Sequence, residues 1–201
     1  LFSFANTTNN KTMEWLTRTI VIIDPCINPD GRDRYVQFYT MTGNHPPDAD
    51  VGTREHQEPW PGGRTNHYYF DLNRDWTWQT QTETVQRLRL YNRWMPHIHV
   101  DYHEQYFDEP YYSAPAAKPY HEQITSWQRD FQKIIGTNHT RYFDRNHWLY
   151  FTKEHFDLLY LGYGDTYPIY NGAIGMTYEK AGGAAAGISA FTSDGDTLTL
   201  R

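Results

Sequence analysis

Alternation of polar and apolar residues is clearest over residues 97–103 (His-Ile-His-Val-Asp-Tyr-His). A period of two is typical of a β-strand, and here it predicts one apolar face and one face that carries the three histidines and Asp101. The apolar face holds Ile98, Val100 and Tyr102. Because open α/β sheets bind ligands at the carboxyl ends of their strands, His103 becomes a candidate site residue.

Other runs predict further strands. Residues 19–23 form a continuous β-branched run of the kind found in buried parallel strands. Residues 173–179 alternate, and their apolar positions are expected to face the core. Residues 68–72 predict a shorter strand, and residues 197–200 are also strand-like.

Helical patterns lie between these strands. A short helix is expected at residues 11–19, and a longer one at residues 80–96, where Thr80 and Glu83 have capping-box spacing and Pro96 ends the pattern. Residues 121–135 predict a third helix that stops at Gly136. Its expected apolar stripe consists of Ile124, Trp127, Phe131 and Ile134.

Glycine and proline mark the connections between these elements. Residues 28–31 (Asn-Pro-Asp-Gly) predict a turn, residues 32–67 are rich in loop signals, and residues 161–168 are expected to form a loop. Alternation of strands and helices favours one α/β domain over residues 1–201, with a mixed, mostly parallel sheet and helices on both faces.

Composition narrows the function classes. The chain has 17 Tyr and 7 Trp, which supply large buriable area, and a net charge of −6. This mild acidity and the lack of a Lys/Arg run argue against a nucleic-acid partner, and no apolar run is long enough for a membrane span. Cys26 is the only cysteine, so an intramolecular disulfide and a thiolate metal cage are both excluded.

Four short motifs occur in order along the chain. They are Asn-Pro-Asp-Gly at 28–31, Asp-Leu-Asn-Arg at 71–74, Asp-Tyr-His-Glu at 101–104 and Thr-Tyr-Glu at 177–179. Together they resemble the ordered motifs of the zinc carboxypeptidases related to carboxypeptidase A. The resemblance covers most of the chain, and it implies a three-layer α/β/α fold and zinc-dependent hydrolysis of C-terminal residues from peptides or proteins.

By this resemblance, His103 matches the third zinc ligand of the family, and neutral imidazole is the commonest ligand for such metals. Asp101 lies on the same strand face, and two interpretations are open: a hydrogen-bond acceptor for the ligand, or a solvated charge. His97 and His99 are too far apart along one strand to bind the same ion, so we expect neither to be a ligand.

Asn73 and Arg74 match the pair that holds the terminal carboxylate of the substrate in the family. A guanidinium fork binds a carboxylate bidentately, and the amide adds a donor. Glu179 matches the general base, which activates the zinc-bound water and later protonates the leaving amine.

The family also uses an arginine that stabilises the oxyanion and a tyrosine that covers the substrate. Arg64 is the candidate for the first role, with Arg54 in reserve, and Tyr163 is preferred to Tyr167 for the second. Asp165 has two interpretations: it selects basic side chains, or it is a turn residue.

One departure from the family pattern concerns zinc. The family takes its first two ligands from a His-x-x-Glu motif upstream of Asn-Pro-Asp-Gly, and this sequence contains no His-x-x-Glu. The nearest imitation, His45-x-x-Asp48, follows that turn. We therefore expect a catalytic domain truncated on its N-terminal side, with two zinc ligands upstream of Leu1 and no activity in the isolated chain.

Three alternatives remain open. The same machinery could hydrolyse a cell-wall or side-chain amide, or the protein could be a non-catalytic peptide-binding relative. A carbohydrate-active protein would need a carboxylate pair, for which Glu104 and Glu179 are the candidates. The expected partner is a peptide or protein C-terminus, and the resemblance implies a secreted or periplasmic location.

Overall fold

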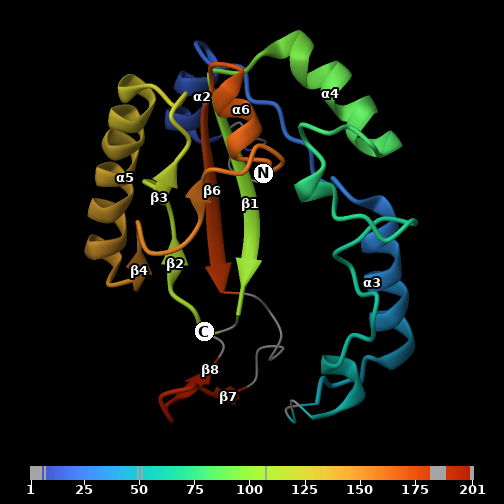
Figure 1. Ribbon diagram of the computed structural model, residues 1–201. Helices are drawn as coiled ribbons and strands as arrows, with labels where there is room; N and C mark the ends of the chain where they lie inside the picture. The colour runs from blue at the N-terminus through green and yellow to red at the C-terminus, as the bar shows by residue number, and fades with distance from the viewer. Residues whose placement is uncertain are drawn as a thin grey trace.

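The computed structural model describes residues 6, 8–48, 50, 52–106, 108–181 and 189–199 and places helices around a small central sheet (Figure 1). The helices are α2 (Asn10–Leu16), α3 (Pro29–Thr42), η1 (Arg54–His56), η2 (Leu72–Arg74), α4 (Thr82–Trp94), α5 (Ser126–Asn146) and α6 (Thr166–Tyr170). The strands are β1 (Ile98–Gln105), β2 (Tyr111–Tyr112), β3 (Ala117–Tyr120), β4 (Tyr150–Phe151), β5 (Asp157–Leu158), β6 (Ile174–Ala181), β7 (Ser189–Phe191) and β8 (Thr197–Thr199).

The main sheet has the order β1-β6-β2-β4. β1 is parallel to β6 and β2 is parallel to β4, whereas β2 and β6 pair in the antiparallel direction. The predicted α/β class with a mixed, mostly parallel sheet is therefore confirmed. β3 and β5 form a separate parallel pair, and β7 and β8 form an antiparallel hairpin.

The two faces of the sheet differ in polarity, although Ile98 and Tyr102 on the predicted apolar face of β1 are 49% and 76% exposed. Ile174 and Met176 are buried against Ala114, and Val100 packs on the same cluster together with α5 side chains. In Figure 1, α5 lies along the left side of the sheet. The opposite face carries Asp101 and the residues that alternate with this apolar set, so the polar groups gather on one side.

Helix α5 is longer than the sequence pattern indicates. It begins at a capping box between Thr125 and Gln128 and continues past Gly136, so the predicted stop at this glycine is wrong. Gly136 is buried in the helix, and a Cβ there would lie 2.7 Å from Cδ of Pro115 and would also meet the carbonyl of Ala114. The glycine therefore allows close approach of the helix to the chain that follows β2.

The predicted apolar stripe of α5 is also wrong in part. Trp127 and Ile134 are 61% and 64% exposed. Buried glutamines take the inner positions: Gln128 Nε2 donates to the carbonyls of Ile169 and Ala173, and Gln132 Nε2 donates to that of Gly175 at 2.7 Å. These amides satisfy carbonyls around the start of β6, where an apolar side chain would leave them without a partner.

Gly175 is a point of close contact between β6 and the loop before α6. A Cβ at this position would collide with the backbone oxygen of Asp165, so only glycine fits. The α6 helix begins at Thr166, inside the stretch predicted as a loop.

The N-terminal third differs most from the prediction. The helix expected at residues 11–19 is present as α2, but residues 19–23 form no strand and Ile20 is 74% exposed. A β-branched run becomes a strand only beside a partner strand, and none pairs with it in the described part of the chain.

Residues 28–31 begin a helix instead of forming an isolated turn. The Asn28 side chain caps α3 by accepting from the N–H of Gly31 at 3.0 Å, and Pro29 occupies the first helical position. The predicted loop at residues 32–67 is therefore wrong up to Thr42.

Residues 68–72 also form no strand. The side chain of Asn66 accepts from the backbone N–H groups of Tyr68 and Phe70, and this turn replaces a sheet ladder. Helix α4 begins at Thr82. The side chain of Asp75 accepts from the backbone N–H groups of Thr80 and Gln81 before it, and this contact replaces the predicted capping box of Thr80 and Glu83.

Within the described ranges, no helix is both long and apolar enough to cross a membrane.

Candidate functional site

His103 and Glu179 are neighbours at the carboxyl ends of β1 and β6. The parallel register pairs residue 98 with 174 and continues without a shift to His103 and Glu179. Adjacent strands lie about 4.8 Å apart, and paired residues point to the same face. The pairing thus brings together the predicted zinc ligand and the predicted general base, which are far apart in sequence.

Asp101 connects His103 to the second motif. Its Oδ2 atom is 2.7 Å from His103 Nε2 and accepts from Asn73 Nδ2 at 2.9 Å. Asn73 Nδ2 also lies 2.8 Å from His103 Nε2. A carboxylate can only accept, so we assign the Nε2 proton to the bond with Asp101, which makes Nδ1 the nitrogen with a lone pair in the neutral ring.

Gly164 holds the other side of Asn73. Its backbone N–H donates to Asn73 Oδ1 at 2.7 Å, so the amide group is fixed at both ends. A Cβ on Gly164 would lie 2.7 Å from Asp101 Oδ2 and 2.9 Å from Asn73 Oδ1. The loop before α6 can therefore reach the cluster only because this residue is glycine.

Burial and hydrogen bonding shift the pKa values of Asp101 and His103 in opposite directions. Burial alone would raise the pKa of Asp101, but the hydrogen bond and charge of His103 lower it below its ordinary value. Burial alone would lower the pKa of His103, but the hydrogen bond and charge of Asp101 raise it. Asp101 therefore orients the His103 ring and makes it more basic. Carboxylates have the same effect on histidines that bind metals.

Glu179 has the properties of a general acid–base group. Its side chain is buried, and burial raises its pKa to about 7, although the charge of His103 opposes this rise. Among the described residues its Oε2 atom has no hydrogen-bond partner. A carboxyl group that titrates near neutral pH can both take up and release a proton.

Arg64 and Arg74 share the carboxylate of Asp71. Arg64 Nε donates to Asp71 Oδ2 at 3.0 Å, and Arg74 Nη1 lies 3.7 Å from the same oxygen. The Arg74 guanidinium also stacks on the ring of Tyr163, 4.4 Å from its centroid. Both arginines are about half exposed, so they keep donors for an anionic ligand.

Tyr167, the second substrate-binding candidate, points elsewhere. Its ring contacts Trp76 and Tyr91, and its hydroxyl donates to Asn92 of α4 at 3.4 Å. Arg54, the reserve for Arg64, lies in η1, which contacts α3. The structure therefore groups Tyr163 with Arg74 and does not add Tyr167 to this group.

Asp165 is not exposed to a ligand. It is 4% exposed, and its two oxygens accept from the hydroxyls of Thr166 and Thr177 at 3.0 and 2.8 Å. Burial raises its pKa to about 6. Of the two interpretations from sequence, selection of basic side chains has no support from this placement.

The other candidate groups lie outside the cluster. The ring of His99 packs on Trp76 and Tyr91, and burial lowers its pKa to about 4. Glu104 forms an exposed ion pair with Lys180 at 2.8 Å. It therefore does not form a carboxylate pair with Glu179 of the kind a glycosidase needs.

Zinc requires more ligands than the described residues supply. They contain no group of three or more His, Cys, Asp and Glu side chains that could hold a metal ion. His103 offers Nδ1 as one ligand, whereas a catalytic zinc normally has three from the protein. The described residues alone therefore do not fit a complete zinc site.

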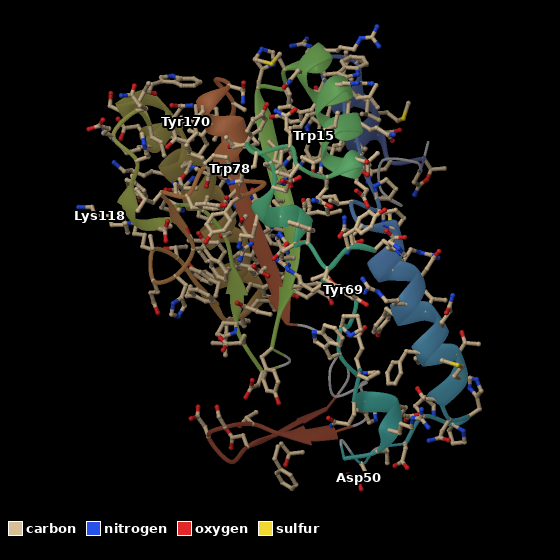
Figure 2. All side chains as sticks on the ribbon, turned by 45° about the vertical axis from the view of Figure 1, so that its right-hand side comes forward. Trp15, Asp50, Tyr69, Trp78, Lys118 and Tyr170 are labelled. Atoms are coloured by element: carbon tan, nitrogen blue, oxygen red, sulfur yellow. The ribbon has the colours of Figure 1, made fainter. Side chains whose placement is uncertain are left out.

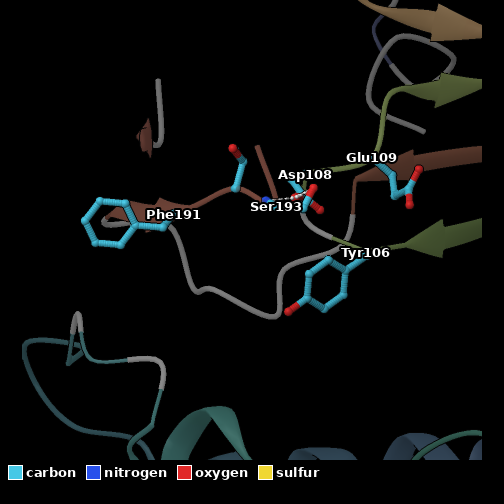
Figure 3. Close-up of a pocket in the computed structure, with 6 residues that line it drawn as sticks. Tyr106, Asp108, Glu109, Phe191 and Ser193 are labelled. Carbon is cyan, nitrogen blue, oxygen red and sulfur yellow. Dashed lines mark hydrogen bonds between the residues drawn. The ribbon is translucent and has the colours of Figure 1, made fainter. Parts of the chain in front are cut away.

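A cavity of about 410 Å³ lies where the chain leaves β1 (Figure 3). It is bounded by Tyr106, Asp108 and Glu109 on one side and by the β7–β8 hairpin on the other. The hairpin is attached here because Ser193 donates to Asp108 Oδ2 through its N–H at 3.1 Å and through its hydroxyl. None of the residues predicted from sequence lines this cavity.

Two residues of the site were missed by the sequence analysis. Gly164 and Asp71 fix Asn73 and the two arginines, yet neither was assigned a role. The place of Asp71 at the start of the Asp-Leu-Asn-Arg motif could have indicated its role, whereas nothing in the sequence distinguishes Gly164 from the other glycines of its loop.

Comparison with known proteins identifies no relative: no family model matches this sequence, and no curated protein or solved structure matches it either.

Proposed function

We propose that this chain is part of the catalytic domain of a zinc metallocarboxypeptidase with a three-layer α/β/α fold, which removes C-terminal residues from peptides or proteins. The observation that carries the proposal is the pairing of His103 with Glu179 at the carboxyl ends of two parallel strands. The ordered sequence motifs support it independently.

Binding of the substrate carboxylate is assigned to Asn73 and Arg74. One N–H of the Asn73 amide is used by Asp101, and the amide has a second N–H to offer. Arg74 adds a half-exposed guanidinium that is held in place by Tyr163. A free C-terminus would bind here by replacing the contact between Arg74 and Asp71.

Proton transfer is assigned to Glu179. Its carboxylate would accept a proton from the attacking water and then donate it to the leaving amine, which suits a group with a pKa of about 7. Arg64 would donate to the oxyanion. Zinc, when bound by His103 and by ligands outside the described residues, would supply the Lewis acid that activates the water.

The test uses the full-length natural protein, loaded with zinc and incubated with a mixed peptide set that is followed by mass spectrometry. We expect loss of single C-terminal residues and no cleavage of C-terminally amidated peptides. Glu179→Gln should lower the rate at least about 100-fold, because general acid–base catalysis contributes factors of this size. Glu122→Gln, at an exposed position, is the matched control and should leave the rate unchanged.

Other results would replace the proposal. Stoichiometric zinc without trimming would favour an amidase that acts on cell-wall or side-chain amides. Neither zinc nor trimming would favour a peptide-binding relative without catalysis. A secreted or periplasmic location is part of the proposal, by resemblance only.

A further inference from the structure

We propose that a basic cavity beside α5 binds a small molecule that carries a phosphate group. The cavity has a volume of about 740 Å³ and lies between β3, the first half of α5 and the turn at Lys153. Pockets for small molecules usually have volumes of about 300–1,000 Å³. Lys118, which lines it, lies on the left of Figure 2, on the opposite side of the molecule from α3.

Positive charge is concentrated in this cavity. The chain contains only five lysines, and three of them, Lys118, Lys133 and Lys153, line this one cavity. Arg129 adds a fourth cation, and Glu154 is the one acidic residue in the lining. In a protein with a net charge of −6, such a local excess of positive charge favours an anionic ligand.

Most of these cations are available to a ligand. Lys118 and Lys153 form no ion pair with any described residue, and Lys133 has only an exposed pair with Asp130, which contributes little. One N–H of the Arg129 guanidinium donates to the carbonyl of Ile124, so its other N–H groups are available. The cavity therefore presents several donors that no protein acceptor occupies.

Backbone contacts hold the walls of the cavity in place. The N–H of Lys153 donates to the carbonyl of Pro115 at 3.1 Å, and β3 pairs with β5. The hydroxyl of Tyr120 donates to the carbonyl of Ala116 at 2.6 Å, which fixes the course of β3. Because the segments that carry Lys118 and Lys153 are joined in this way, the backbone positions of these two residues are fixed relative to each other before a ligand binds.

The chemistry of the lining favours phosphate. Ammonium groups are compact, strongly hydrated point charges, and lysine is a common phosphate ligand in proteins. A phosphate group offers several negative oxygens that can contact several such charges at once. The volume of the cavity lies in the range of small-molecule sites.

Inorganic pyrophosphate is the probe, titrated into the whole protein by calorimetry at low salt. Lys118→Gln/Lys153→Gln should raise its dissociation constant at least about tenfold, because each removed charge weakens the attraction severalfold. The control Lys11→Gln/Arg89→Gln removes the same charge from α2 and α4 and should change the constant by less than about twofold. Absence of binding to the unchanged protein, or equal loss in the control, would overturn the proposal.

A second measurement needs no variant. Acetylation of lysine side chains by an amine-reactive reagent is followed by mass spectrometry with and without pyrophosphate. We expect pyrophosphate to slow the modification of Lys118 and Lys153 several-fold and to leave that of Lys11 unchanged. Equal rates at all three lysines would show that the anion does not occupy this cavity.

Discussion

Replacement of Asp165 by asparagine is predicted to stabilise the protein at neutral pH. The carboxyl group is buried between Thr166 and Thr177, and it forms no ion pair with a described residue. Burial raises its pKa from 3.8 to about 6, despite the hydrogen bonds from the two threonines. At pH 7 the folded protein must therefore hold an ionised carboxylate in a poor environment.

The magnitude follows from the shift in pKa. A rise of about two units corresponds to about 3 kcal/mol, since each unit is worth about 1.4 kcal/mol. Between about pH 4 and pH 6 the folded state binds more protons at Asp165 than the unfolded state does. The contribution of Asp165 to the free energy of unfolding is therefore greatest below about pH 4. It decreases as the pH rises to about 6 and is constant above that pH.

Asp165→Asn removes this titration and keeps the shape of the side chain. One threonine hydroxyl must turn to accept from the new amide, which offsets part of the gain. We expect the free energy of unfolding at pH 7 to rise by about 2 kcal/mol, and the difference from the unchanged protein to vanish near pH 3.5.

The assay is urea unfolding followed by tryptophan fluorescence at several pH values from 3.5 to 8. Asp194→Asn, at an exposed position in the β7–β8 hairpin, is the control and should shift the unfolding free energy by less than about 0.5 kcal/mol. A variant at Asp165 that is less stable than the unchanged protein at pH 7 would refute the reasoning. So would a difference that does not depend on pH.

Three other substitutions test the packing and the site. Gly136→Ala should lower the free energy of unfolding by about 1–3 kcal/mol in urea denaturation, because its Cβ would meet the carbonyl of Ala114; no loss would mean that α5 lies farther away. Thr125→Ala removes the capping box of α5 and should cost about 1 kcal/mol, measured by thermal unfolding; an unchanged midpoint would contradict this role. Gly164→Ala should cost about 1–3 kcal/mol and lower any peptidase activity, since its Cβ would press on Asp101; retention of both would show that the loop is not tightly held.

The two long strands of the central sheet, β1 and β6, could be predicted from sequence because their signal is local, whereas the two-residue strands β2 and β4 were not predicted. Alternation predicted which side chains share a face in β1 and β6, although Ile98 and Tyr102 proved exposed, and α2 and α4 lie close to their expected positions. Residues 19–23 were predicted wrongly because β-branched residues favour a strand only where a partner is available. Gly136 was read as a helix stop, yet a close approach from another segment explains this glycine, and such a contact leaves no local signal.

In the candidate site, too, the residues could be named from sequence, whereas their contacts required the structure. The resemblance of the four ordered motifs to the carboxypeptidase family singled out His103, Asn73 and Glu179 as candidates, but it did not show which atoms are in contact. Asp101 could be interpreted as a solvated charge or as a partner of His103, and only the folded chain places it between the imidazole and the Asn73 amide. The choice between Tyr163 and Tyr167 depended on side-chain direction, which the pattern of a loop does not determine.

The close contact at Gly175 has a consequence four residues further along β6. Only a residue without Cβ fits beneath the backbone oxygen of Asp165, so β6 cannot slip by one position without forcing Ile174 or Met176 into that space. A slip of one residue would turn every β6 side chain to the opposite face and remove Glu179 from the side of His103. Gly175 has no reactive group, yet it fixes the register of β6 and so determines that Glu179 lies beside His103.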